Sequence, residues 1–506
     1  MALSEGLFFA PAHRLVAMLR AREVSSAELV AEFLERIRSV NRKLNAIVTL
    51  AEERAGREAE AADKRLARAG DARPLEGLPV TIKDSVITEG IRSTWGMKAF
   101  EHFVPPADAP VVARLRAAGA IVIGKSNTPE MTMDYDCDNP VFGRTNNPWR
   151  LDRVPGGSSG GEAAALAAGM SPLGIGSDYR GSIRVPAHLC GVVGLKPSWG
   201  TIPASGHMAP APAAPPALAH MATIGPMARY VDDLTLAYNI VKGPHPSTPY
   251  TVPTPDAHPE NVDVRKVRCA IFTSGCDVPV APDIRGAIER AGRALQKAGL
   301  IIEDVHPPVD EGERLWWEYQ GADGNQLMIE TFGEAIRQSR ARLRELLKPG
   351  PSKSAADFFK ISFARDVWRV QLAEFMERYP IILGPAFCTT AFAHEATELE
   401  VDGKRFPYVM GGWPAAWGNC AGVPGVVVPI GQDREGLPIG LQINGRPFDE
   451  QTVLAIAKVV EQELGGYQRP PKWSRGTDQL SGHSTAVKGR SDPDRANVSA
   501  RLGGIS

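Results

Sequence analysis

Residues 155–198 read PGGSSGGEAAALAAGMSPLGIGSDYRGSIRVPAHLCGVVGLKPS. This stretch holds two glycine loops that carry serines, residues 156–161 and 176–182, and the alanine-rich residues 162–168 between them predict a short helix. Glycine lets the backbone approach other groups closely and adopt positive φ. The two loops therefore indicate backbone N–H groups gathered at one point with hydroxyls among them. Such an arrangement suits the stabilisation of a developing oxyanion beside a serine nucleophile.

The composition is that of an ordinary globular protein. The chain has 506 residues, of which 43% are hydrophobic and 23% charged, and this length allows a large core. A net charge of −1 gives no reason to expect nucleic acid or an anionic membrane as a partner. We also expect no membrane span, because there is no run of about 18 apolar residues and the N-terminus lacks the features of a signal peptide.

Cysteine and histidine usage predicts a cytoplasmic protein without a metal site. The six cysteines are scattered and form no CxxC pair, which is typical of buried free thiols in a reducing compartment. The histidines are scattered too, and His394-Glu395 does not continue into the HExxH pattern of a zinc protease.

Helical and strand-like segments alternate along the chain. Residues 10–70 look helical, with a capping box from Ser25 to Glu28, and residues 77–84 form a β-rich run that contains Lys83. Further segments predict helices at 109–118, 231–241, 283–298 and 449–464 and strands at 120–124, 266–273, 301–305, 381–385, 425–430 and 437–443. A helix followed by a short apolar strand is the pattern of an α/β sheet, so we predict an α/β fold.

Three regions depart from this pattern. Residues 125–150 are rich in Asn, Asp and Pro and predict a long irregular loop, of a length that is often functional. Residues 311–380 are helical and aromatic-rich, which indicates either core packing or a cover over an apolar substrate pocket. Residues 468–506 are polar without periodicity and predict a partly disordered tail. We therefore expect a single domain over residues 1–467.

Three residues can be combined into one catalytic arrangement. Ser182 follows residues whose backbone amides can face an oxyanion, Ser158 lies in the other glycine loop, and Lys83 ends a strand-like segment in an apolar setting. A serine needs a base to act as a nucleophile, and neither loop contains a histidine. A lysine can serve if burial lowers its pKa so that the amine is neutral. A Lys–Ser–Ser relay is therefore one interpretation; a surface lysine with an anion-binding nest of loop amides is the other.

The chain resembles the amidase signature family of serine hydrolases. The family pattern is roughly GGSSGG(S/E), then GSDxGGSIRxPA and CGxxGLKPT, and it is matched here within residues 156–198. Other segments also fit the family: residues 77–84, which resemble its catalytic-lysine motif, and residues 127–130, 139–148, 419–429 and 436–442. The resemblance covers about residues 5–465 and implies one large domain built on a twisted mixed β-sheet of about eleven strands with helices on both faces.

The resemblance also implies catalytic roles. Ser182 is the nucleophile that accepts the acyl group from an amide, Lys83 is the ultimate base, and Ser158, which carries a cis peptide in the family, bridges the two. The N–H groups of the oxyanion hole are those of Tyr179, Arg180, Gly181 and Ser182. The residues that support these groups are Ser159, Asp178 and Arg184. No metal or cofactor is implied.

Arg180 departs from the family, which usually has glycine at this position. If that glycine provides a positive φ, Arg180 is strained or the loop is reshaped. We hypothesise that the backbone donors are kept and that the Arg180 side chain lines the pocket mouth, where it contacts a carbonyl or carboxylate of the substrate. The alternative is that Arg180 pairs with a nearby acid.

The loop around Tyr135 predicts the character of the substrate. Met131, Thr132, Met133 and Cys137 lie in a segment that lines the acyl site of relatives, and flexible methionines suit an adaptable apolar pocket. We therefore expect an aryl or medium-size apolar amide or anilide as substrate.

Other functions stay open. The same relay serves a carbamate hydrolase or the glutaminase subunit of a tRNA-dependent amidotransferase, which would need partner subunits. A non-catalytic ligand-binding protein of the same fold is a further alternative. A nucleotide-binding nest is disfavoured, because no GxxxxGK[ST] sequence accompanies the glycine loops. The sequence also leaves a homodimer open.

Overall fold

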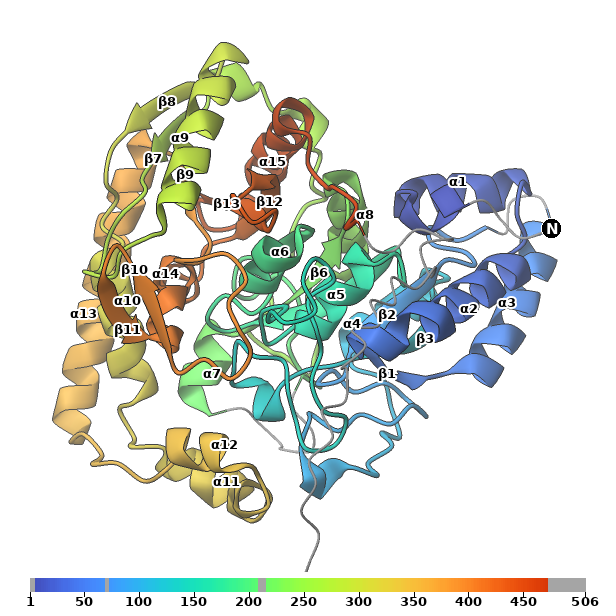
Figure 1. Cartoon of the computed structure of the whole chain (residues 1–506), viewed down its shortest axis with the longest axis horizontal. Helices are drawn as coiled ribbons and strands as arrows, with labels where there is room; N and C mark the ends of the chain where they lie inside the picture. The colour runs from blue at the N-terminus through green and yellow to red at the C-terminus, as the bar shows by residue number, and fades with distance from the viewer. Residues whose placement is uncertain (1–4, 69–71, 208–214, 472–506) are drawn as a thin grey trace, which may run out of the picture. The chain divides into compact units, whose positions relative to one another are not determined.

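A mixed β-sheet of eleven strands runs through the computed structural model, which describes residues 5–68, 72–207 and 215–471 (Figure 1). In their order across the sheet, the strands are β1 (Ile47–Leu50), β3 (Ile121–Ser126), β2 (Pro79–Lys83), β4 (Leu173–Asp178), β6 (Thr223–Ala228), β5 (Val193–Lys196), β12 (Gly425–Gln432), β13 (Pro438–Gly445), β9 (Ile381–Pro385), β7 (Arg268–Ile271) and β8 (Ile301–Asp304). Strand β2 is parallel to β3 and β4, and β7 is parallel to β8 and β9. The other neighbours in the sheet are antiparallel. This sheet confirms the predicted fold class.

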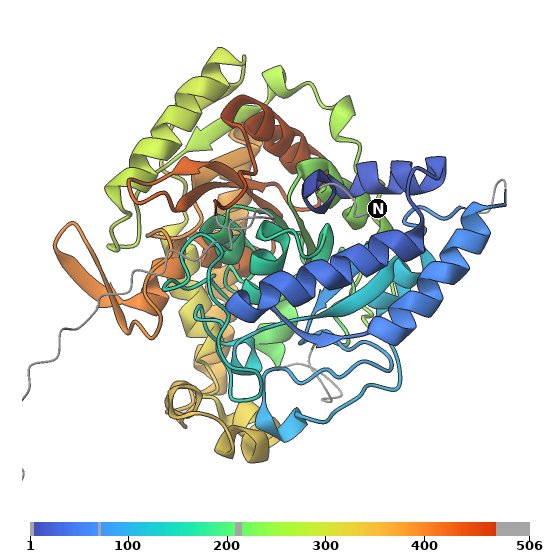
Figure 2. The same cartoon turned by 45° about the vertical axis from the view of Figure 1, so that its right-hand side comes forward.

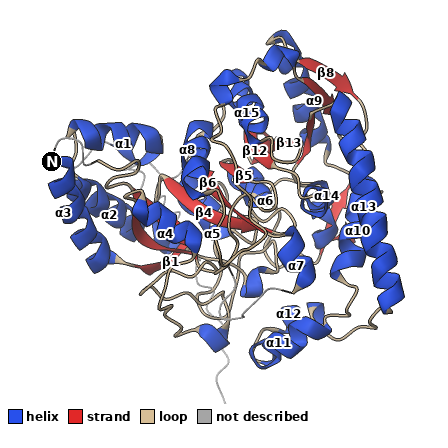
Figure 3. Ribbon diagram, turned by 180° about the vertical axis from the view of Figure 1, so that it is seen from behind, coloured by secondary structure: helices blue, strands red, loops and turns tan. Residues whose placement is uncertain are grey.

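Helices cover both faces of the sheet (Figure 3). They are α1 (Ala12–Ala21), α2 (Ser26–Leu44), α3 (Glu52–Leu66), α4 (Pro110–Ala117), α5 (Gly160–Ala167), α6 (Arg184–Cys190), α7 (Pro216–Met221), α8 (Val231–Val241), α9 (Pro282–Lys297), α10 (Asp310–Gln320), α11 (Gln326–Arg337), α12 (Ala341–Leu346), α13 (Ala355–Arg378), α14 (Trp413–Ala421) and α15 (Glu450–Leu464). In β13, a Cβ on Gly440 would contact His188 of α6, whereas a Cβ on Gly445 would contact Val453 of α15. Residues an odd number of positions apart in a strand point to opposite faces, so α6 and α15 lie on opposite faces.

Smaller elements complete the chain. A separate two-stranded sheet and short 3-10 turns lie between the main elements: β10 (Glu398–Val401), β11 (Lys404–Pro407), η1 (Glu5–Phe9), η2 (Lys98–Phe100), η3 (Glu130–Thr132), η4 (Pro259–Asn261), η5 (Val264–Lys266) and η6 (Tyr408–Gly412). Between residues 127 and 150, η3 is the only regular element, which confirms most of the predicted long loop. Residues 125 and 126, where the loop was predicted to begin, are the last two residues of β3.

Most of the described part of the N-terminal segment is helical. Helices α2 and α3 lie side by side near β3 (Figure 2), and Ser25 forms the predicted capping box with Glu28. The prediction of helix throughout residues 10–70 is wrong at residues 47–50, which form β1. These residues pair with residues 124–126 of β3, and this sheet pairing overrides the helical character of the flanking segments.

The ends of two parallel strands bring the predicted catalytic segments together. Lys83 is the last residue of β2 and Asp178 is the last residue of β4, and residues 179–182 follow directly. The carboxyl ends of parallel strands meet at one edge of a sheet, where α/β proteins usually bind ligands. The lysine and the second glycine loop therefore lie at the same edge.

Most of residues 311–380 lie in α10, α11, α12 and α13. Trp316 and Trp368 are buried, whereas Phe359 and Phe363 are 71% and 72% exposed. Core packing therefore explains only part of the aromatic content of this segment.

The predicted polar tail, residues 468–506, lies outside the described residues from residue 472 onward. Over residues 5–68, 72–207 and 215–471, none of the helices has the length and apolar character that spanning a lipid bilayer requires.

Candidate active site

Lys83 is fully buried, and its amine contacts serine hydroxyls. Its Nζ lies 2.7 Å from Ser158 Oγ, 2.9 Å from Ser177 Oγ and 3.1 Å from Ser159 Oγ. Burial disfavours the charged amine and lowers the pKa of Lys83 from its usual 10.5 to about 7. A large fraction of the amine is therefore neutral near neutral pH, and a neutral amine can accept a proton.

Glu162 lies close to the lysine in the first turn of α5 and is also fully buried. Its carboxyl group accepts hydrogen bonds from Thr81 Oγ1 of β2 at 2.5 Å and from Ser126 Oγ of β3 at 2.6 Å. Burial raises the pKa of Glu162 from 4.5 to about 7. Glu162 thus links α5 to β2 and β3. Because its pKa is raised, it carries less negative charge near Lys83 at neutral pH than an exposed glutamate would.

The first glycine loop brings Ser158 to the lysine. The Gly157–Ser158 peptide bond is cis, as the resemblance implies. A Cβ on Gly157 would come within 2.2 Å of the Asp134 carbonyl oxygen, so a side chain does not fit there. Ser159 N donates to Ser182 O at 3.1 Å. This bond joins the first glycine loop directly to the second.

Two aromatic side chains hold the backbone of the second loop. Trp316 Nε1 of α10 donates to Tyr179 O at 3.2 Å, and Tyr135 OH donates to Arg180 O at 2.6 Å. Because a peptide group is planar, fixing a carbonyl also fixes the direction of the following N–H group. The loop therefore has a defined orientation before any substrate binds.

The N–H group of Gly181 is not available for the predicted oxyanion hole. Its N–H donates to Asp178 Oδ1 at 2.8 Å, so this donor is already occupied. The N–H groups of Tyr179, Arg180 and Ser182 have no partner in the described part of the chain and remain as candidate donors. The positive φ of the loop, 90°, also falls on Gly181 and not on Arg180, so the strain considered for the arginine does not occur.

Asp178 and Arg184 form a fully buried ion pair behind this loop. Arg184 Nη2 lies 3.0 Å from Asp178 Oδ1, and Arg184 Nε lies 3.1 Å from Oδ2. Although burial opposes ionisation, Arg184 holds the pKa of Asp178 well below its usual range. Ile183 N donates to the same carboxylate at 3.0 Å. The ion pair thus fastens the start of α6 to the end of β4 on either side of Ser182.

Two cavities meet at Ser182. Ser158, Ser177 and Ser182 line a cavity of about 470 Å³ whose other walls are mostly apolar. Ser182 also lines a second cavity of about 240 Å³, together with Arg180 and Trp317. A substrate carbonyl at Ser182 can therefore have one substituent in each cavity.

The predicted pocket residues fall into two groups. Met131, Thr132 and Met133 line the larger cavity. Cys137 does not; it is fully buried, with its Sγ 3.7 Å from Thr145 Oγ1. Its assignment to the substrate pocket is corrected accordingly, because its side chain packs against Gly160 at the start of α5, where a Cβ would come within 2.8 Å of the Cys137 Cβ.

The site also contains residues to which the sequence analysis gave no role. Ser177 and Glu162 lie inside the quoted motifs. Their residue types are visible there, but the hydrogen bond of Lys83 to Ser177 and those of Glu162 to Thr81 and Ser126 are not. His207 lines the larger cavity, although it lies 25 residues after Ser182 in the sequence. His207 lies in a Pro/Ala-rich segment, residues 203–216, whose sequence carries no catalytic signal.

Comparison with known proteins now decides the family. The family model described as Amidase matches residues 28–454. The chain belongs to the amidase family. This match confirms the predicted family. Enzymes of the amidase signature family hydrolyse carbon–nitrogen bonds.

Individual relatives in the amidase family carry different names. A glutamyl-tRNA(Gln) amidotransferase subunit of Roseiflexus castenholzii is 34% identical over 488 residues, 90% of this chain and 96% of the relative. Indoleacetamide hydrolase of Bradyrhizobium diazoefficiens is 35% identical over 470 residues, 89% of this chain and 85% of the relative. The solved structure of 6-aminohexanoate cyclic dimer hydrolase with its substrate is 26% identical with a TM-score of 0.81, and the match covers 92% of this chain and 100% of that one.

Arg180, the residue at which this amidase family member departs from the usual pattern, is paired inside the protein. Its guanidinium forms an ion pair with Glu313 of α10 and donates to Val409 O at 2.6 Å. The guanidinium also lies 4.7 Å from the ring centre of Trp317. This arrangement matches the second of the two possibilities, in which the arginine pairs with a nearby acid.

We expect Arg180→Gly to lower kcat/KM by the same factor for a neutral amide and for an amide that carries a carboxylate. The guanidinium is committed to Glu313, so it contributes loop support and not recognition of an anion. Loss of one partner of a buried pair costs about 3–5 kcal/mol of stability, so thermal unfolding is measured alongside, with Arg180→Gly/Glu313→Gln as the variant that removes the stranded charge. A selective loss for the anionic substrate would show that the arginine contacts substrate.

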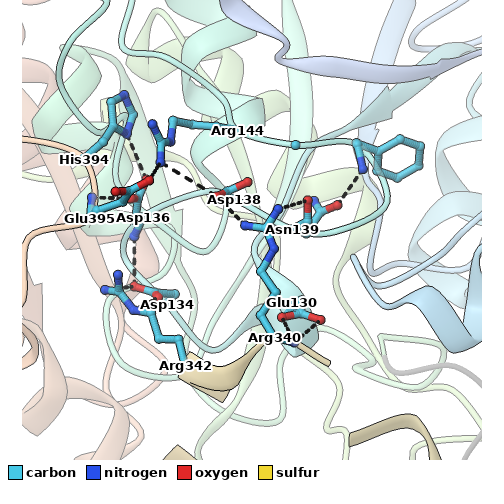
Figure 4. A network of polar contacts seen from close by, with 12 residues as sticks. Glu130, Asp134, Asp136, Asp138, Asn139, Arg144, Arg340, Arg342, His394 and Glu395 are labelled. Carbon is cyan, nitrogen blue, oxygen red and sulfur yellow. Dashed lines mark hydrogen bonds and ion pairs between the residues drawn. The ribbon is translucent and has the colours of Figure 1, made fainter. Parts of the chain in front are cut away.

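A polar network fastens α11 and α12 to the loop that contains Met131 (Figure 4). Arg342 Nε of α12 lies 2.7 Å from Asp134 Oδ2. Arg340 pairs with Asp138, and its backbone N–H lies 3.1 Å from Glu130 Oε2. An apolar cluster separate from the main core also joins this loop to the two helices. Its members are Trp95, Met97, Met131, Met328, Phe332, Ala335, Ile336, Leu343 and Leu347. Since α11 also lines the larger cavity, these contacts hold one wall of the candidate active site in place.

We expect Arg340→Ala/Arg342→Ala to raise KM for an apolar anilide about 3- to 10-fold, with a much smaller change in kcat. Partly exposed ion pairs contribute about 0.2–1 kcal/mol each, and their loss loosens a cavity wall without touching the relay. Steady-state kinetics check this, and Arg337→Ala is the matched control because Arg337 pairs with Glu334 on the same helix. A fall in kcat as large as the rise in KM would contradict a role confined to the wall.

Proposed function

We propose that this protein is an amide hydrolase that works through an acyl-enzyme on Ser182, with Lys83 and Ser158 as the proton relay. The observation that carries the proposal is the environment of Lys83. The amine is fully buried, its pKa is lowered to about 7, and it lies 2.7 Å from a serine hydroxyl that lines the same cavity as Ser182. A buried neutral amine in contact with a serine is the chemistry that a serine hydrolase without a catalytic histidine requires.

The proposed reaction uses Lys83, Ser158 and Ser182 in turn. Lys83 takes a proton from Ser158 while Ser158 takes one from Ser182, and Ser182 Oγ bonds to the amide carbon. The oxyanion lies against the free N–H groups of residues 179, 180 and 182, each worth about 3 kcal/mol in comparable sites. The C–N bond then breaks as the relay returns the proton to the leaving nitrogen. Water repeats the sequence on the acyl-enzyme, so that amide and water give carboxylic acid and amine.

The walls of the larger cavity favour an apolar substrate. Met131, Met133, Leu218 and Phe358 are among the residues that line it, and methionine adapts to ligands of different shape. The indoleacetamide hydrolase relative has a name that gives an indole-bearing amide as its substrate. We therefore propose an aryl or medium-size apolar amide or anilide, with a carbamate of similar shape as the alternative for the same relay.

A second candidate is a glutaminase subunit that works with partner subunits. The glutamyl-tRNA(Gln) amidotransferase relative matches this chain at 34% identity over 90% of its length, which favours this candidate. Glutamine carries two charged groups that need polar partners, and most of the cavity wall is apolar, which weighs against this candidate. Asp323, Glu330 and Lys353 also line the cavity, so the activity measurement decides between the two functions. Release of ammonia from glutamine, measured with the chain alone and with the other subunits of an amidotransferase present, distinguishes the two.

The proposal is tested by trapping the acyl-enzyme. The protein is incubated with a panel of anilides, primary amides, carbamates and glutamine, quenched in acid, digested and analysed by mass spectrometry. We expect an acyl adduct on the peptide that contains Ser182 and turnover with the apolar amides. Absence of both adduct and turnover would favour a non-catalytic binding protein, and turnover of glutamine alone would favour the glutaminase function.

A further inference from the structure

His207 has an unused hydrogen-bonding atom in the candidate active site. The side chain is only 6% exposed and lines the larger cavity together with Ser158 and Ser182. Its buried Nε2 has no hydrogen-bond partner in the described part of the chain. An unpaired buried polar atom costs about 1–3 kcal/mol. Inside a cavity next to a nucleophile, this cost is offset if the substrate supplies the partner.

The backbone holds His207 at a fixed place relative to the relay. Ile87 N, just after β2, donates to Gly206 O at 2.9 Å, and His207 N donates to Ala204 O at 3.2 Å. Gly206 has a φ of 80°, and a Cβ there would come within 2.7 Å of the Ala109 Cβ. A glycine is therefore needed directly before the histidine. The imidazole is anchored through the same chain segment that carries Lys83.

The imidazole is neutral when the relay works. Burial lowers the pKa of His207 from 6.5 to about 3, so the ring is uncharged at the pH values where Lys83 is neutral. One ring nitrogen of a neutral imidazole lacks a proton and accepts a hydrogen bond. His207 therefore cannot act as a second cationic group. In the tautomer that carries its proton on Nδ1, its Nε2 can accept a hydrogen bond from an N–H group.

The two cavities show which substrate atom lies near His207. In the proposed reaction, Ser158 must deliver a proton to the leaving nitrogen, and Ser158 lines the larger cavity but not the smaller one. The leaving nitrogen therefore faces the larger cavity, the one that His207 also lines. Protonation requires the lone pair of this nitrogen to point at Ser158 Oγ, which directs the N–H group away from Ser158.

We propose that Nε2 of His207 accepts a hydrogen bond from the N–H of the scissile amide and thereby turns the nitrogen lone pair toward Ser158, an inference that rests on the proposed amide hydrolysis at Ser182. The residue makes the site selective for amides that carry at least one N–H. An ester of the same shape has no N–H and gains nothing from His207. An N,N-disubstituted amide is a poor substrate for the same reason.

The test compares a p-nitroanilide and a p-nitrophenyl ester that share one apolar acyl group. For each protein, the ratio of kcat/KM for the anilide to kcat/KM for the ester is measured. We expect His207→Leu to lower this ratio about 10-fold or more, the equivalent of losing about 1.4 kcal/mol in the transition state. His207→Gln, whose side-chain oxygen also accepts, recovers part of the ratio. Ser205→Ala is the control on the same segment, since Ser205 Oγ pairs with Ser247 and does not line the cavity.

The outcomes separate this proposal from the proposed function. Two outcomes overturn the role of His207. One is an unchanged ratio in both His207 variants. The other is a ratio that stays low in His207→Gln although this variant melts like the wild type. Hydrolysis that survives Ser182→Ala overturns the proposed function instead, whatever the ratio. A melting curve for each variant shows that the comparison is made between folded proteins.

Discussion

Ser182→Ala is expected to abolish amide hydrolysis, with kcat falling by at least about 10⁴-fold. In the proposed mechanism, the variant loses the atom that bonds to the acyl group, while Lys83, Ser158 and the loop N–H groups stay in place. Removing the hydroxyl opens little space, because Ser182 is 9% exposed and already borders two cavities. Labelling by a fluorophosphonate probe, which reacts with activated serines, should disappear together with turnover.

Ser171→Ala is the matched control for this experiment. Ser171 is a fully buried serine near the opposite end of β4, and its hydroxyl donates to Leu173 O at 2.8 Å, away from both cavities. This variant should keep both labelling and turnover. Labelling that persists in Ser182→Ala and is mapped to Ser158 or Ser177 would move the nucleophile to another serine of the same cluster.

The main elements of the fold were predictable, and the segments of the proposed relay could be picked out, because their signals are local and long. The two glycine loops and the lysine motif each occupy a continuous run of sequence, so residue type and spacing indicate their role. The helix prediction failed at β1 because four residues, 47–50, are drawn into the sheet by β3, which lies far along the chain. Local propensity does not contain that information.

The details of the site depended on contacts between distant segments. The acid that pairs with Arg180 comes from α10, so the sequence offered two roles for the arginine and no way to decide between them. Gly181 could not be excluded as an oxyanion donor until the structure showed its N–H bound to Asp178. His207 reaches the cavity through a segment with no motif of its own. In each case the residue type was visible, but the partner that gives it a role was not.

The second large effect is expected on replacing Lys83, the proposed general base. Lys83→Met should lower kcat/KM about 10²- to 10⁴-fold, the range usual for loss of a general base. The pH profile is the sharper measurement. Only the neutral amine accepts a proton, so kcat/KM of the wild type should fall about tenfold per unit as pH drops below about 7, and level off above it. Lys83→Met should show low activity without this inflection.

Two other buried groups have a pKa near the same value and must be separated from Lys83. Burial lowers the pKa of Lys196 to about 7 and raises that of Glu162 to about 7. The Nζ of Lys196 donates to Pro197 O at 2.9 Å, whereas the Nζ of Lys83 lies 2.7 Å from Ser158 Oγ, so Lys196→Met should keep the inflection. Glu162→Gln should also keep it, because the amide can still bond both hydroxyls that Glu162 contacts. If the inflection vanished in Lys196→Met and persisted in the residual activity of Lys83→Met, the base would not be Lys83. The pKa alone does not distinguish the two lysines; the contact of Lys83 with Ser158 does.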